Sequence, residues 1–293
     1  MVFETLRKYY RYNLIRMEEN FKPALKVGLF GIGLQAYWEQ FEGLEQRLKG
    51  YVDVVAERLQ TYGAEIVNLG LVDTPEKAYA SGSRFRREEV DLIFLYVTTY
   101  ALSSTVLPVV SRAKVPVIVL NLAPEAAIDY ATFNKMENST AMTGEWLAYC
   151  SACPVPEIAS VFNRSNIPFY QITGMLNNDP VVWSEVEEWI GAAKVAHTMY
   201  YNRLGVMGSY YNGMLDIYSN LTLHCATFGG HIEILEVDEL SGLREGVTDA
   251  EANEKINAFH TRFDVQDDCS EQELKRAAIT AVALDKLVEK HKL

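Results

Sequence analysis

Apolar runs of strand length alternate with longer amphipathic stretches through the first part of the chain. The short runs are continuously apolar, which is typical of parallel strands covered by helices on both faces. The longer stretches repeat their apolar positions at helical spacing. This order predicts successive βαβ units and a doubly wound α/β fold. Strands are expected at 25–31, 65–70, 91–97 and 115–122, with helices near 42–62, 75–89 and 103–113.

Helical patterning continues beyond the fourth expected strand. A helix is predicted to begin after Asn138 or Ser139, because the side-chain oxygens of "NSTAMTGEW" can accept hydrogen bonds from free amides at a helix start. A helix "PEIASVFNRSN", a strand "IPFYQITG" and a long helix "NDPVVWSEVEEWIGAAKVAHTMYYN" follow. His197 lies on the apolar stripe of that long helix, which favours a satisfied interface histidine over a metal ligand.

A second series with the same alternation begins at residue 203. Strands are expected at 203–208 and 231–237, with helices near 213–228, 249–263 and 270–291. The pattern therefore predicts two Rossmann-like α/β domains. We assign an N-terminal domain to residues 1–170 and a central domain to residues 171–293, whose long terminal helices are candidates to pack back on the first domain.

The charge of the chain narrows the classes of partner. The formal net charge is -12, so nucleic acid and anionic membrane surfaces would be repelled. No apolar run approaches the roughly 20 residues that cross a bilayer. We therefore expect no nucleic-acid or membrane partner and a cytoplasmic location.

The cysteines include one closely spaced pair, Cys150 and Cys153 in "CSAC". Spacing alone makes this pair the best metal or redox candidate. A zinc site needs a second pair of ligands, and a thioredoxin-like motif opens a helix after a strand. The pair is instead predicted to close a helical stretch before "PVPE". We therefore interpret the pair as thiols without a special role, with a metal or redox site as the alternative. The other two cysteines are Cys225 and Cys269.

The stretch "GIGLQAYW" fits a relaxed dinucleotide fingerprint through Gly31 and Gly33. A dinucleotide turn needs a helix that begins at once and an acid at the end of the second strand. Bulky residues follow Gly33 instead, and the second strand is expected to end at Asn68 without an acid. An amide flanked by aromatic rings favours neutral hydroxyls, so Gln35 predicts a polyol site. A nucleotide-dependent oxidoreductase stays as a third interpretation that rests on the glycines alone.

The sequence resembles the L-arabinose isomerase family, which is related to the L-fucose isomerases, in the order of its elements over nearly the whole chain. "GIGLQAYW" places Gln35 on a substrate-facing glutamine of that family, and Tyr100 falls on a substrate-facing aromatic residue. "ENSTA" places Asn138 on an amide of the family's "Asn-Gln-Thr-x-His" type segment, with Ala141 where a histidine is often found. Tyr211 falls near another pocket position. The departure at Ala141 leaves the sugar preference open.

The resemblance implies a longer enzyme than this chain. Members of the family have two Rossmann-like domains followed by a β-barrel-containing domain, and the ligands of their Mn²⁺ ion belong to the segment beyond residue 293. No catalytic residue and no metal ligand are therefore expected in this chain, and Mn²⁺ is not expected to bind to it alone. Homo-oligomeric assembly is implied, because N-terminal loops of one subunit cover the active site of its neighbour.

Two functional hypotheses follow. The first is the substrate-covering and oligomerisation portion of a metal-dependent aldose–ketose isomerase, with a monosaccharide as partner and no activity in this chain alone. The alternative is a stand-alone two-domain sugar-binding module without catalysis.

Overall fold

The computed structural model describes residues 23–208 and 211–293. Contacts divide the chain into two compact units, Pro23–His197 and one that contains Thr198–Leu293. This division falls inside a helix, and the domain boundary assigned between residues 170 and 171 stays a prediction. Among the described helices, none is long and apolar enough to cross a membrane.

The first unit contains one five-stranded parallel sheet in the order β2-β1-β3-β4-β5. Its strands are β1 (Lys26–Ile32), β2 (Glu65–Val72), β3 (Leu92–Tyr96), β4 (Val117–Ala123) and β5 (Phe169–Met175). Strand order reverses at β1, since β2 lies on one side of it and β3 on the other. The predicted doubly wound parallel sheet is confirmed for this unit.

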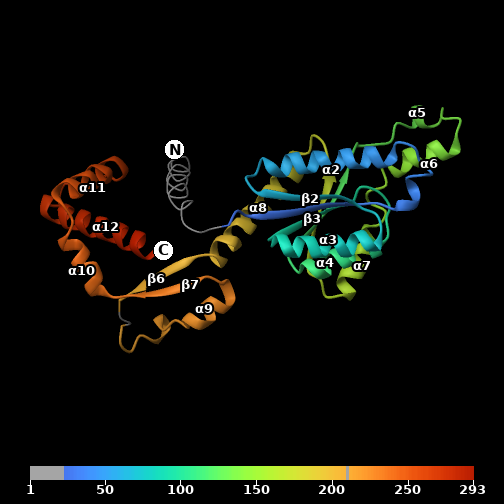
Figure 1. The fold of residues 1–293 in the computed structure, drawn as a ribbon. Coiled ribbons are helices and arrows are strands. Elements are labelled where there is room, and N and C mark those ends of the chain that lie inside the picture. The colour runs from blue at the N-terminus through green and yellow to red at the C-terminus, as the bar shows by residue number, and fades with distance from the viewer. Residues whose placement is uncertain (1–22, 209–210) are drawn as a thin grey trace. The chain divides into compact units, whose positions relative to one another are not determined.

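Helices cover both faces of this sheet, with α2 on one side and α3, α4 and α7 on the other (Figure 1). Their bounds are α2 (Leu44–Gln60), α3 (Pro75–Glu88), α4 (Leu107–Ala113), α7 (Val155–Arg164) and α8 (Pro180–Tyr200). Leu48 of α2 and Val186 of α8 share one buried cluster with Leu29. Phe85 of α3 and Phe162 of α7 belong to a second buried cluster. Burial on both faces explains the uninterrupted apolar strands.

Short elements occupy the connections between these strands and helices. They are η1 (Gln35–Tyr37), η2 (Ser103–Thr105), α5 (Tyr130–Phe133) and α6 (Ser139–Leu147). Asn138 caps α6, where its side-chain oxygen accepts a hydrogen bond from the Thr140 amide at 2.9 Å. The predicted helix start after Asn138 is therefore confirmed.

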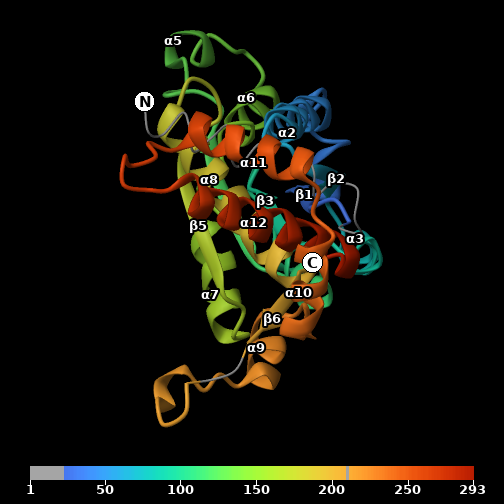
Figure 2. The same cartoon turned by 90° about the vertical axis from the view of Figure 1, so that its left-hand side faces the viewer.

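The described residues of the second unit do not form a Rossmann-like sheet, so that part of the predicted fold class is wrong. Its described strands, β6 (Arg203–Met207) and β7 (His231–Leu235), form a two-stranded parallel pair. The remaining elements are η3 (Leu215–Ile217), α9 (Leu221–Phe228), α10 (Val237–Glu245), α11 (Asp249–Arg262) and α12 (Glu271–His291). Helices α11 and α12 lie side by side (Figure 1 and Figure 2). An ion pair joins them, with Lys286 Nζ 2.7 Å from Glu251 Oε1. They pack on each other instead of alternating with further strands.

His197 fastens the two ends of the first unit together. Its Nδ1 lies 2.9 Å from the Asp91 carboxylate and its Nε2 lies 2.7 Å from the Pro23 carbonyl oxygen. Asp91 precedes β3 and Pro23 precedes β1, so this contact is at the amino ends of the strands. The ring is 8% exposed. The interpretation of His197 as a satisfied structural histidine is confirmed.

The glycines of β1 and its loop allow close packing. A Cβ atom at Gly31 would lie 2.5 Å from the Val52 side chain, and one at Gly33 would lie 2.7 Å from the Trp38 ring. Neither glycine has a positive φ angle. Their small size is therefore what matters, because each leaves room for a side chain that packs on the strand or its loop.

We predict opposite effects for two glycine substitutions. Gly33→Ala should lower the free energy of unfolding by about 1–3 kcal/mol, because the new methyl group overlaps the Trp38 ring. Gly50→Ala, within α2 and with no atom within 4 Å of the added carbon, should raise it by about 0.5–1 kcal/mol. Urea unfolding of both variants measures the difference. Equal stabilities would contradict the packing role of Gly33.

Candidate functional site at the carboxyl edge of the sheet

Ligand sites of open parallel sheets lie at the carboxyl ends of the strands, near the point where strand order reverses. That point is between β1 and β3 here. The segments that leave this edge are the β1–α2 connection, the loop after β3, and the long connection from β4 through α5 and α6 to α7. These three segments supply the side chains at this edge.

The β1–α2 connection is fixed to the end of β2 through Asp73. The Trp38 indole N–H donates to the Asp73 carboxylate at 2.8 Å, and Lys77 Nζ lies 2.7 Å from its other oxygen. Strand β2 continues to Val72, so the expectation that it ends at Asn68 without an acid is wrong. The acid is nevertheless buried and occupied by protein donors, and α2 begins only at Leu44. Among the described residues the Asp73 Oδ1 atom has no hydrogen-bond partner, but it is buried 2.7 Å from Lys77 Nζ, so no exposed acid is offered to a nucleotide ribose here.

The four predicted substrate-binding residues are not gathered around one described cavity. Gln35 is exposed in η1, and Tyr100 follows β3 at the neighbouring part of the edge. Burial, and next the nearby Tyr100, raise the pKa of the Tyr37 phenol. Asn138 is exposed and caps α6, whereas Tyr211 lies in the second unit and is 71% exposed. Their substrate-binding role stays a prediction.

Sequence reasoning missed an ion pair that ties α6 to α2. The Arg47 guanidinium donates to Glu145 at 2.7 Å and to the Tyr51 hydroxyl at 2.7 Å, and it lies 5.1 Å from the centre of the Tyr149 ring. Burial lowers the pKa of Arg47, but the hydrogen bonds to Glu145 and Tyr51 raise it by more. The guanidinium therefore stays charged. The helical spacing of Arg47 and Tyr51 was visible in the sequence, whereas Glu145 is distant along the chain.

The "CSAC" pair forms a disulfide, so the interpretation of these two residues as thiols is wrong. Cys150 and Cys153 are bonded, with their Cα atoms 5.7 Å apart, whereas Cys225 and Cys269 are free. Cys150 is 4% exposed and Cys153 is exposed. The pair lies between α6 and α7 and is followed at once by the start of α7 at Val155.

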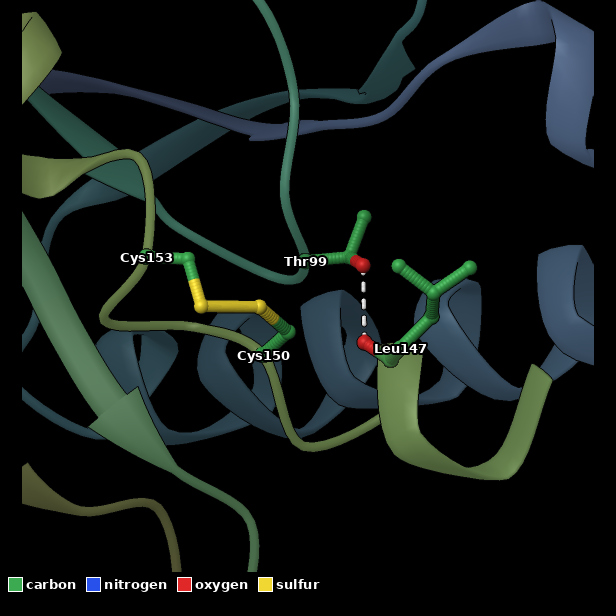
Figure 3. Close-up of a disulfide and its surroundings, with 4 residues drawn as sticks. All are labelled: Thr99, Leu147, Cys150 and Cys153. Atoms are coloured by element: carbon green, nitrogen blue, oxygen red, sulfur yellow. Dashed lines mark hydrogen bonds between the residues drawn. A yellow bond between two sulfur atoms is a disulfide. The ribbon is translucent and has the colours of Figure 1, made fainter. Parts of the chain in front are cut away.

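A buried hydroxyl holds this disulfide loop at the end of β3 (Figure 3). The Thr99 hydroxyl donates to the Leu147 carbonyl at 2.7 Å, and Thr99 is fully buried. The same carbonyl oxygen accepts a hydrogen bond from the backbone N–H of Cys150 at 3.2 Å. One acceptor therefore joins the loop after β3 to the first cysteine of the disulfide.

Other reactive arrangements are missing from this edge in the part of the chain that the structure describes. No group of three or more His, Cys, Asp or Glu side chains could hold a metal ion within residues 23–208 and 211–293. The single histidine of the first unit, His197, is at the opposite edge, and its Nε2 faces a backbone carbonyl oxygen instead of a serine hydroxyl. The disulfide is thus the group at the carboxyl edge whose covalent state can change.

Comparison with known proteins gives no family. No family model and no curated protein matches the chain. A candidate acylhydrolase from Bacteroides fragilis NCTC 9343 is 14% identical, with a TM-score of 0.32, and the match covers 62% of this chain and 94% of that one. A GDSL-like lipase from Bacteroides thetaiotaomicron VPI-5482 is 15% identical, with a TM-score of 0.29, and the match covers 64% and 98%. Likeness this low carries no argument about the activity of this chain.

The resemblance to the L-arabinose isomerase family is nevertheless corrected. The family has a second Rossmann-like domain, whereas the described residues of the second unit form only a two-stranded parallel pair. The isomerase assignment is wrong, and so is the alternative of a stand-alone sugar-binding module. The motifs that supported them were short, and the second Rossmann-like domain that they implied is not formed.

We predict that the Thr99 hydroxyl is needed to hold the disulfide loop. Thr99→Val keeps the shape of the side chain but leaves the buried Leu147 carbonyl without that donor, so the free energy of unfolding should fall by about 1–3 kcal/mol. Thr143→Val, which removes an exposed hydroxyl on α6, should change it by less than about 0.5 kcal/mol. Urea unfolding compares the two, and equal small effects would contradict the anchor.

Proposed function

We propose that the Pro23–His197 unit is a thiol–disulfide redox module, in which the bond between Cys150 and Cys153 opens and closes by exchange with a dithiol. The observation that carries the proposal is this disulfide, which joins one exposed and one buried cysteine and is fixed to the carboxyl edge of the sheet. Carboxyl edges are where open parallel sheets place their functional groups.

The size of the disulfide loop argues against a purely structural role. The two cysteines are separated by three positions, so the bond restricts a very short piece of the unfolded chain. The loop-entropy relation gives about 2 kcal/mol for such a loop, compared with about 3 kcal/mol for a loop of about 15 residues. The unit already has two large apolar clusters that stabilise its fold. The bond therefore stabilises the unit by less than a disulfide that closes a longer loop would.

Exposure determines the route of the exchange. A thiolate of the reductant attacks the exposed Cys153 sulfur, the S–S bond breaks, and Cys150 leaves with the electron pair and takes a proton. The second thiol of the reductant then attacks the mixed disulfide and releases Cys153 as a thiol. The reductant becomes a disulfide, and two electrons and two protons have passed to the pair. Cys153 precedes the start of α7 at Val155, so the positive end of that helix dipole favours its thiolate once the bond is broken.

The predicted cytoplasmic location supports the same function. Disulfides of cytosolic proteins are usually transient and serve catalysis or redox sensing. The location itself stays a prediction, as does homo-oligomeric assembly. The expectations of a monosaccharide partner and of Mn²⁺ in a longer enzyme came from the corrected resemblance, and they play no part in the proposal.

We predict that the pair is reversibly reduced while the fold is kept. In a variant with Cys225→Ser and Cys269→Ser, air-exposed protein should show no reactive thiol, and reduction with dithiothreitol should reveal two. Oxidised dithiothreitol should then return the count to none. Mass spectrometry after alkylation gives the counts, and far-ultraviolet circular dichroism follows the fold.

The matched variants distinguish an exchangeable pair from a structural bond. Adding Cys150→Ser to that background should leave Cys153 reactive without reduction, whereas Cys153→Ser should leave a buried Cys150 that reacts more slowly. Reactive thiols before reduction in the parent variant would contradict the disulfide. Loss of the helical signal on reduction would show a structural bond and contradict the proposal.

A further inference from the structure

A second feature of the first unit is a cavity of about 590 Å³ between α2 and the connection from β5 to α8. Its volume is within the range of about 300–1,000 Å³ that is usual for small-molecule sites. The lining residues come from the second half of α2 and from the segment that includes Asn177 and Trp183. None of the lining residues belongs to the disulfide loop, so the cavity is independent of the redox proposal.

The wall formed by the β5–α8 connection is held in place by its own hydrogen bonds. The Trp183 indole N–H donates to the Leu176 carbonyl at 3.2 Å. The Asp179 carboxylate accepts hydrogen bonds from the backbone amides of Met175 at 3.0 Å and Val182 at 3.2 Å. These backbone donors lower the pKa of Asp179. The wall is therefore preformed, and Asp179 adds a negative charge whose oxygens are already engaged.

Arg58 supplies the positive charge of the cavity. Its guanidinium lies 5.4 Å from the centre of the Trp183 ring, which is a cation–π distance. Val54, Arg58 and Thr61 share one face of α2 because they are three or four positions apart. Within residues 23–208 and 211–293, no carboxylate lies within ion-pair distance of Arg58. Its donors are thus available to a ligand.

The remaining polar groups narrow the class of ligand. A guanidinium binds a planar carboxylate through two parallel hydrogen bonds. Glu57 and Asp179 line the same cavity, so a phosphate dianion would face more repulsion than a carboxylate with a single charge. Glu57 can accept a hydrogen bond from the ligand, and the Asn178 amide can donate or accept. The Asn177 side chain donates to the Pro124 carbonyl oxygen at 3.5 Å, and its own oxygen can accept.

We infer that this cavity binds a small monocarboxylate that also carries a hydroxyl or amino group. The Trp183 ring positions the Arg58 guanidinium, which binds the carboxylate of the ligand. The Glu57 carboxylate accepts a hydrogen bond from the hydroxyl or amino group of the ligand. The ligand class is thus a hydroxy acid or an amino acid.

The test uses glycolate, glycine and inorganic phosphate as separate probes of the full chain. NMR titration follows the Arg58 Nε–H and the Trp183 indole N–H, which are both at the site. Glycolate or glycine should shift both signals in a saturable way, and phosphate should bind at least about tenfold more weakly. The shifts should leave the signals of Cys150 and Cys153 unchanged, so failure here is distinguishable from failure of the redox proposal.

Arg58→Gln should weaken binding of the carboxylate by about tenfold or more, because the charged hydrogen bonds are lost. Arg112→Gln is the matched control, since Arg112 lies 4.7 Å from the centre of the Tyr79 ring and does not line the cavity. The affinity of the Arg112→Gln variant for glycolate and glycine should equal that of the unsubstituted protein. The inference is overturned by the absence of saturable shifts, by phosphate binding as tight as that of either carboxylate, or by equal affinity in Arg58→Gln.

Discussion

The buried hydrogen bond from Thr99 to the Leu147 carbonyl is the interaction on which the proposed redox site depends. The loop after β3 and the end of α6 are distant in sequence, and this single acceptor joins them at the carboxyl edge of the sheet. The same carbonyl accepts the amide of Cys150, so the position of the disulfide follows from that bond. Because the hydroxyl is fully buried, losing it would leave a carbonyl without a compensating contact from water.

The ion pair between Arg47 and Glu145 adds a second attachment of α6, this time to α2. Helix α6 is exposed over much of its length, and Leu147 is its one buried residue. Apolar packing alone therefore fixes it weakly. Two polar contacts from different elements restrict both its position and its rotation. The cysteine loop that follows is consequently presented at a defined place, with Cys150 inside and Cys153 outside.

Local patterns predicted the elements of the first unit well, because its strands are apolar runs between helices with clear caps, such as Asn138 at α6. Strand β2 extended beyond its predicted end because Gly70, with a positive φ of 65°, lies inside the strand where the register with β1 shifts. The sequence offers no simple means to distinguish such a glycine from one that ends a strand. In the second unit, two runs did form strands, but their number was too small for another doubly wound sheet.

The candidate site was less predictable, since it depends on contacts between distant residues. Neither the pairing of Arg47 with Glu145 nor the bond between Thr99 and Leu147 leaves a signal in the local sequence. Asp73 could be recognised as an acid, but its occupation by Trp38 and Lys77 follows from the folded loop alone. The spacing of Cys150 and Cys153 was noticed, yet the absence of a preceding strand led to the wrong interpretation. Short matches such as "GIGLQAYW" led to the wrong family assignment.

The most direct test of the central claim is an equilibrium titration of the Cys150–Cys153 pair in redox buffers of known potential. An exchangeable pair should be half reduced between about -300 and -180 mV, the range of cellular dithiol systems, with a slope for two electrons. A pair that stays oxidised at more reducing potentials than about -300 mV would behave as a structural disulfide and contradict the account. So would a pair that remains reduced across the whole range.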